Sequence, residues 1–101
     1  MNEETRDRFR LEAVRQVWLG TKQTADDYLG LRLFVQASKD KNVKIRRTVF
    51  RRLLSMNFKL TNFKEEDRMQ IILNGLKDPD TQVVIQCKQY LIQQICAKEG
   101  T

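Results

Sequence analysis

Histidine is absent from this 101-residue chain, which removes the side chain that most often serves as a general base or a metal ligand. The chain has four glycines and a single proline, Pro79, so few positions interrupt a helix. No run of about 18 apolar residues occurs, and the N-terminal segment is polar and of mixed charge. The sequence therefore predicts neither a membrane-spanning segment nor a secretory signal.

Cysteine is also rare. Cys87 and Cys96 are nine residues apart in one helical pattern, which separates them by about 13 Å along a helix axis, too far for a disulfide. They lack the C-x-x-C spacing that is typical of zinc or redox sites. We expect both to be reduced, half-buried core thiols in an intracellular, reducing compartment, and we expect no metal or other cofactor.

The acidic residues give little support for catalysis. The groups Asp26–Asp27 and Glu65–Asp67 fall in the first turns of predicted helices, where carboxylates offset the helix dipole. The glycines are isolated, so no glycine-rich phosphate loop exists. The enzyme alternative is a DNA glycosylase of HEAT-like fold, which would need Asp27, Trp18 and Tyr28 around one cleft. We expect a protein that is not an enzyme.

Amphipathic helical periodicity covers nearly the whole chain. Apolar content is 41% and charged content 32%, which is typical of one folded, helix-rich domain spanning residues 1–101. Five helices are predicted, near residues 4–18, 24–38, 42–56, 64–76 and 81–97. The second is apolar nearly all round, so we expect it to be buried, with Gly30 as a close-packing site.

The last predicted helix carries two apolar strips. The broad strip consists of Val83, Val84, Cys87, Tyr90, Leu91 and Ile95. The narrow strip lies nearly opposite and consists of Ile85, Ile92 and Cys96. A helix that stacks between two neighbours needs both strips, whereas the terminal helix of a closed domain needs only one.

An internal period of 40 residues also indicates stacking. When Asp40 is aligned with Asp80, three apolar pairs coincide: Val43 with Val83, Ile45 with Ile85, and Phe50 with Tyr90. This period is expected of HEAT or armadillo repeats, which are helical hairpins. We therefore predict an all-α fold that is a fragment of a right-handed α-solenoid, built from HEAT/armadillo-like antiparallel helix pairs.

The spacing of Asp40 and Arg46 fits the side-chain ladder of HEAT repeats, in which a turn aspartate pairs with a cation six residues later. Asp80 occupies the turn position of the second copy, but Gln86 stands where its cation would be. We expect Asp40, Arg46 and Asp80 to form a structural ladder between hairpins that is incomplete at Gln86. The proline expected in the first helix of a HEAT unit is missing.

Positive charge is concentrated in residues 39–59. This segment holds eight Lys or Arg and one acid, a net charge of +7, in a chain whose total is +6. Its apolar residues fall on one half of a helix, and most of its cations fall on the other. Two interpretations stay open, a solvated helix face or a stripe that neutralises successive phosphates. The candidate polyanion-binding residues are Lys41, Lys44, Arg47, Arg51, Arg52 and Lys59.

Three motifs carry a family resemblance over residues 40–95. The first is D-x-x-V-x-x-R-R, formed by Asp40, Val43, Arg46 and Arg47. The second is R-x-x-x-x-x-x-G-L-x-D, formed by Arg68, Gly75, Leu76 and Asp78. The third is a valine-led helix that contains Tyr-Leu-Ile-Gln at residues 90–93. With these motifs, the chain resembles a segment of the CAP-G-type HEAT-repeat subunit of condensin.

This resemblance implies a role in chromosome condensation in the nucleus, with a kleisin and other condensin-type subunits as partners. It implies that a basic concave surface grips double-stranded DNA through the backbone, independently of sequence and with a log–log salt slope of roughly −4 to −5 for four to six phosphate contacts. The alternative is a HEAT/armadillo-type protein-interaction module that binds an acidic protein or a kleisin-like peptide. The basic residues would suit either partner.

Overall fold

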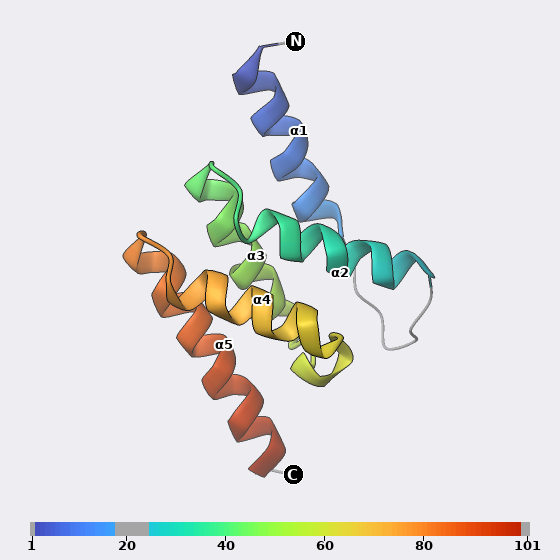
Figure 1. Ribbon diagram of the computed structural model, residues 1–101, viewed down its shortest axis with the longest axis vertical. Helices are drawn as coiled ribbons and strands as arrows, with labels where there is room; N and C mark the ends of the chain where they lie inside the picture. Colours follow the sequence, from blue (N-terminus) through green and yellow to red (C-terminus); the bar gives the residue numbers. More distant parts are fainter. Residues whose placement is uncertain (1, 18–24, 100–101) are drawn as a thin grey trace.

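The computed structural model describes residues 2–17 and 25–99 of the chain. Five α-helices follow one another in this order: α1 (Glu3–Gln16), α2 (Ala25–Ala37), α3 (Val43–Met56), α4 (Glu65–Leu76) and α5 (Thr81–Glu99), with a short 3₁₀ helix, η1 (Leu60–Asn62), before α4 (Figure 1). No β-strand occurs in these residues. The prediction of an all-α chain with five helices is confirmed, and the predicted ends at residues 18 and 24 lie outside the described ranges.

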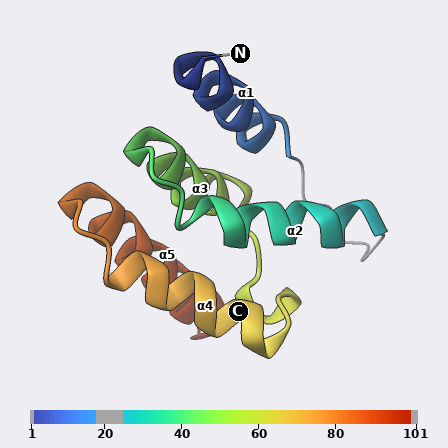
Figure 2. The same cartoon turned by 45° about the horizontal axis from the view of Figure 1, so that its top comes forward.

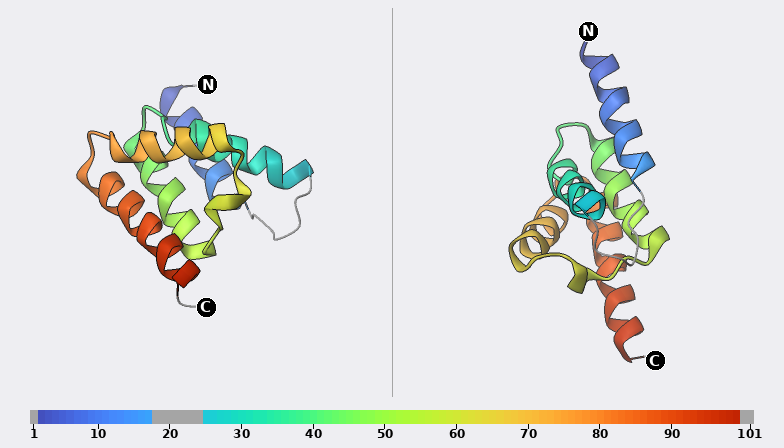
Figure 3. Two further views of the ribbon diagram at one scale, coloured as in Figure 1. Left: turned by 60° about the horizontal axis from the view of Figure 1, so that its bottom comes forward. Right: turned by 90° about the vertical axis from the view of Figure 1, so that its right-hand side faces the viewer.

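The helices form two rows. α3 packs between α1 and α5, whereas α2 and α4 pack beside each other and against α3 and α5 respectively (Figure 2). In the right-hand view of Figure 3, α2 and α4 are seen nearly end-on beside the row of α1, α3 and α5. The molecule measures 48 × 32 × 23 Å, with α1 and α5 at opposite ends of its long axis.

Local sequence fixes both ends of the central helix, α3. The side chain of Asn42 accepts a hydrogen bond from the N–H of Lys44 at the N-terminus. At the C-terminus Asn57 adopts a left-handed conformation, with φ of 49°, and its N–H bonds to the last helical carbonyls. Between these caps Val49 and Leu53 recur at helical spacing and are completely buried.

One apolar cluster, to which all five helices contribute, forms the core. Its fully buried side chains are Val14, Phe34, Ile45, Val49, Phe50, Leu53, Ile71, Val83, Cys87 and Tyr90. The hydroxyl of Tyr90 donates a hydrogen bond of 2.6 Å to the carbonyl of Phe58, which satisfies the polar end of this large side chain. Burial raises the pKa of the Cys87 thiol to about 11, so this cysteine is a neutral core residue at physiological pH.

Two expectations about burial are wrong. Leu29 of α2 is 67% exposed, although this helix is apolar nearly all round and is expected to be buried. The apolar side chain of Phe9 in α1 is also exposed, at 59%. Cys96 is exposed rather than half-buried. The cause is the two-row arrangement, because α1 and α5 are the end helices of their row and α2 has neighbours on only part of its circumference.

Gly75 marks a very close approach between helices. A Cβ atom built on it would lie 2.6 Å from both Sγ of Cys87 and Cζ of Phe50. Both neighbours are fully buried, so neither has free space into which to move. Gly30, the close-packing site expected from the sequence, is also buried.

Replacement of Gly75 by alanine tests this packing. Alanine favours a helix by about 1 kcal/mol, but overpacking of a filled core costs about 1–3 kcal/mol. We expect Gly75→Ala to lower the free energy of unfolding by about 1 kcal/mol, measured by urea denaturation. The exposed control Gln70→Ala should leave stability nearly unchanged, and a stabilised Gly75→Ala variant would contradict the packing described here.

Candidate nucleic-acid interface

Aspartates in the turns between helices bind arginines of the preceding helix in the row of α1, α3 and α5. Asp40, in the turn before α3, accepts hydrogen bonds from Arg10 of α1 at 2.8 and 3.2 Å. The turn before α5 repeats this arrangement twice, with Asp78 binding Arg46 at 2.7 and 3.3 Å and Asp80 binding Arg47 at 2.9 and 2.8 Å. We call these three bidentate pairs the turn ladder.

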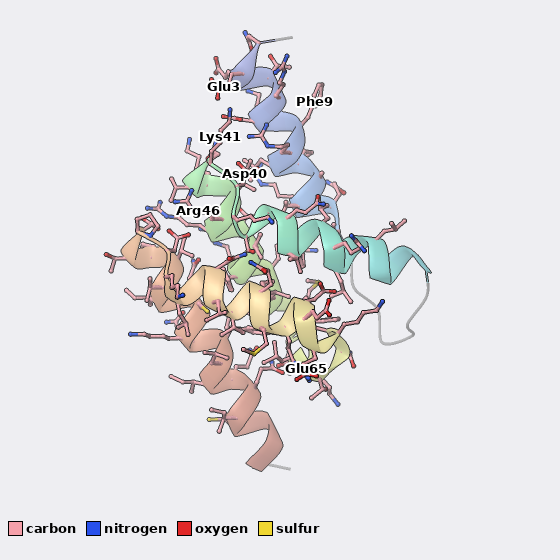
Figure 4. The ribbon with its side chains drawn as sticks, in the orientation of Figure 1. Glu3, Phe9, Asp40, Lys41, Arg46 and Glu65 are labelled. Carbon is pink, nitrogen blue, oxygen red and sulfur yellow. The ribbon has the colours of Figure 1, made fainter. Side chains whose placement is uncertain are left out.

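The pair of Arg46 and Asp78 is the most buried of the three. Only 14% of the Arg46 side chain and 2% of the Asp78 side chain are exposed. Arg46 also donates to the backbone carbonyls of Asp40, at 2.7 Å, and Lys41, at 3.2 Å. One guanidinium therefore joins both inter-helix turns, and its hydrogen bonds offset the cost of burying its charge (Figure 4).

The other two aspartates are held in their charged form. Hydrogen bonding to Arg47 lowers the pKa of Asp80 below its usual value, and the backbone N–H of Val83 adds to this effect. For Asp40, burial alone would raise the pKa, but hydrogen bonds from Arg10 and from the N–H of Asn42 outweigh burial, so its pKa is also lowered. Both turns therefore keep their negative charge at neutral pH.

The predicted ladder residues lie at these turns, but their partners differ from the expected ones. The carboxylate of Asp40 is bound by Arg10, and Arg46 reaches Asp40 only through its backbone carbonyl. Sequence reasoning missed Arg10, Arg47 and Asp78 as ladder members, and it assigned Arg47 to polyanion binding instead. The available signal for Asp78 was its position two residues before Asp80, since either carboxylate can reach one of the adjacent arginines of α3.

Three of the six candidate polyanion-binding cations are engaged within the chain. Arg47 binds Asp80, as described above. Lys41 forms an ion pair with Glu3 (Figure 4), and Arg52 donates to the carbonyl of Val17 at the end of α1. Each of these three charged groups therefore makes a contact within the protein, in addition to any contact with solvent or a ligand.

The remaining three candidates, Lys44, Arg51 and Lys59, are exposed. Within the described part of the chain no carboxylate pairs with them. Lys44 and Arg51 are two helical turns apart, about 10.5 Å along α3, on the side opposite the buried Val49 and Leu53. We call Lys44, Arg51 and Lys59 the open cations.

A separate hollow of about 500 Å³ lies between the two inter-helix turns and α4. The exposed cations Lys39 and Lys77 line it, together with Asn74, whose amide donates to the Ser38 hydroxyl at 3.0 Å. Neither Lys44 nor Arg51 lines this hollow. The chain therefore presents cations at two distinct places.

Comparison with protein-family models, with curated proteins and with solved structures finds no match to this chain.

No group of three or more potential metal ligands occurs among residues 2–17 and 25–99. No helix in those ranges combines the length and apolar character needed to cross a membrane. The glycosylase alternative required Trp18, Asp27 and Tyr28, which fall outside the part of the chain whose side chains the structure describes.

Removal of the Asp78 carboxylate should destabilise the fold strongly, because it leaves the charge of Arg46 buried without its partner. We expect Asp78→Ala to lower the free energy of unfolding by about 3 kcal/mol, measured by urea denaturation. The control Glu4→Ala removes the partner of Arg8 in a pair that is almost fully exposed. It should cost less than about 0.5 kcal/mol, and equal effects of the two variants would contradict the structural role of Arg46.

The lowered pKa of Asp80 predicts how stability depends on pH. Because the folded carboxyl binds its proton less readily than the unfolded one, its stabilisation is present above the unfolded pKa of about 3.9 and is lost as pH falls through the folded value. Asp80→Asn keeps an acceptor for the α5 N-terminus but removes the charge. We expect the variant to be less stable than wild type at pH 7 and the difference to shrink towards about pH 2, measured by urea denaturation across pH. A difference that is constant with pH would contradict this assignment.

Proposed function

We propose that this chain is a non-catalytic segment of a right-handed HEAT-type α-solenoid that binds the backbone of double-stranded DNA in a chromosome-organising complex of the condensin type. Support for the solenoid comes from the order of the helices in space. α1, α3 and α5 lie side by side in space in the order in which they occur along the chain, and each turn carboxylate binds the helix that precedes it in the row. Repetition of such a unit produces a solenoid.

The observation that carries the DNA proposal is the exposure of Lys44 and Arg51 on one face of α3. Nearby arginines that could have joined them are neutralised by aspartates, whereas these two are not. Cations that point into solvent at helical spacing can neutralise phosphates and release counterions. The arrangement is suited to recognising backbone charge rather than base identity, since Lys44 and Arg51 lie on the exposed side of α3 without a set of fixed hydrogen-bond donors around them.

The number of open cations sets the expected salt dependence of DNA binding. With Lys41, Arg47 and Arg52 engaged inside the chain, three phosphate contacts replace the four to six expected from the sequence. The log–log salt slope for duplex binding is then about −3 instead of −4 to −5. Stacking on single-stranded bases has little support, because a single aromatic side chain, Phe9, is exposed among those that the structure describes. The other five, Phe34, Phe50, Phe58, Phe63 and Tyr90, are buried.

In the proposed complex a kleisin and other condensin-type subunits would supply further contacts in the nucleus. A single segment with three phosphate contacts binds DNA weakly, and joining several such segments raises the apparent affinity without new kinds of contact.

The second candidate function is the binding of an acidic protein or a kleisin-like peptide. The hollow beside α4 favours it, because Lys39 and Lys77 line a concave surface large enough for a few side chains. The carboxylates in its lining, Asp40 and Asp78, are already bound by arginines. An acidic segment placed there would meet cations whose charge no described carboxylate offsets.

Two variants of equal charge separate the candidates. Lys44→Glu/Arg51→Glu and Lys39→Glu/Lys77→Glu each change the net charge from +6 to +2. If the DNA proposal holds, only the first weakens binding to a fluorescent mixed-sequence duplex, by about tenfold or more at low salt, measured by fluorescence anisotropy. Titration at several salt concentrations gives the slope.

Binding of the same two variants to a fluorescent glutamate-rich peptide tests the second candidate function. If the peptide candidate holds, Lys39→Glu/Lys77→Glu weakens peptide binding and Lys44→Glu/Arg51→Glu does not. Equal loss of duplex binding in both variants would show that net charge alone matters and would refute a DNA site on α3. Circular dichroism on each variant checks that the helices are intact.

A further inference from the structure

Helix α4 exposes an apolar face that extends from the side away from α2 to the rim of the hollow, where Leu73 lines the hollow together with Lys77. Met69, Leu73 and Leu76 are 58%, 42% and 39% exposed. Asn74 lies about 100–160° from these residues around the helix, and its amide donates to the hydroxyl of Ser38 at the end of α2. The three apolar residues therefore occupy the edge of the row formed by α2 and α4, where no further helix of the described chain covers them.

Helix α5 adds apolar surface at the same end of the molecule. Ile92 and Ile95 are more than half exposed, and Ile85 is partly exposed. Ile85 and Ile92 belong to the narrow strip for which the sequence predicted a neighbouring helix. Several large apolar side chains at one end of a small protein are typical of an interaction surface.

The charges of α4 make this face complementary to itself. Glu66 and Lys77 are both exposed, and no described residue forms an ion pair with either. At about 100° per residue they fall on the same flank of the apolar face, beside Leu73. They are eleven residues apart, about 16 Å along the axis, at opposite ends of that face.

We propose that α4 pairs in antiparallel fashion with α4 of a second copy of this chain. A two-fold axis near the middle of α4 brings residues of the same flank together, so Glu66 of each copy meets Lys77 of the other. The contact between Met69 of one copy and Leu73 of the other lies between these two ion pairs. The interface is isologous, as in most homodimers.

A head-to-tail contact is less suitable, because the opposite end of the molecule does not match this surface. α1 exposes Phe9 beside the charged residues Arg6 and Glu12, which are both exposed and lie within about 60° of it around the helix. A second copy placed with its α1 against α4 would bury these charges against apolar side chains, which is costly. The self-complementary face of α4 avoids that cost.

Matched substitutions of exposed apolar residues test the interface. In sedimentation equilibrium from about 1 µM to about 1 mM, wild type should show a monomer–dimer equilibrium. Met69→Glu should raise the dimer dissociation constant about 100-fold or more, because it places a carboxylate in the contact. The control Leu29→Glu changes an equally exposed apolar residue on α2 and should leave the constant unchanged.

Charge exchange tests the antiparallel arrangement. Glu66→Lys and Lys77→Glu should each weaken self-association, because each places like charges opposite one another at both ends of the interface. Mixed in equal amounts, the two variants should form the mixed dimer in preference to either homodimer, measured by native mass spectrometry at low salt. Lys44→Glu/Arg51→Glu should dimerise as wild type does, so this inference can fail or hold independently of DNA binding.

Loss of the dimer in Met69→Glu but not in Leu29→Glu, together with preferential mixed dimers, supports the proposal. Wild type that stays monomeric across the whole series overturns it. A dimer that is insensitive to Met69→Glu, or mixed dimers formed only in the statistical proportion, also overturns it.

Discussion

The guanidinium of Arg46 holds this fold together at the point where its two inter-helix turns meet. It binds the carboxylate of Asp78 in one turn and the backbone carbonyls of Asp40 and Lys41 in the other. Since this charge is largely buried, the two turns must lie at hydrogen-bond distance from it or leave it unsatisfied. The spacing between successive helix pairs is thereby set by polar contacts at the turns, while the apolar cluster sets the packing of the helices behind them.

This use of charge explains why a strongly basic segment presents so few open cations. Arginine is suited to bidentate pairing with carboxylates, and Arg46 and Arg47 both pair in this way. The residues of this segment left for an external partner are Lys44, Arg51 and Lys59, which lie on the far side of α3 or beyond its end, and Lys39, which lines the hollow beside α4. One helix therefore combines a structural edge of arginines with an outer face of open charge.

The sequence predicted the helices well because amphipathic periodicity, caps and a single proline are local signals. Burial was less predictable, since Phe9 and Leu29 have apolar side chains whose environment depends on which neighbours the helix acquires. The partners of the turn aspartates depend on distances between segments about 30 residues apart, so the spacing of Asp40 and Arg46 identified the region but not the pairs. The approach of Gly75 to Phe50 and Cys87 is likewise visible only in three dimensions.

The turn ladder gives the molecule a polarity, since each cation belongs to one helix of the row and each anion to the turn just before the next helix of that row. Helix α5 offers Gln86 where α3 offers Arg46, and the side-chain oxygen of Gln86 is buried without a partner among the described residues. A carboxylate arriving beyond α5 would meet a neutral amide there instead of a guanidinium. The series of ionic links therefore lacks its cation at this position of α5, and a further segment packed against α5 would remove the exposed Ile85 and Ile92 from water instead.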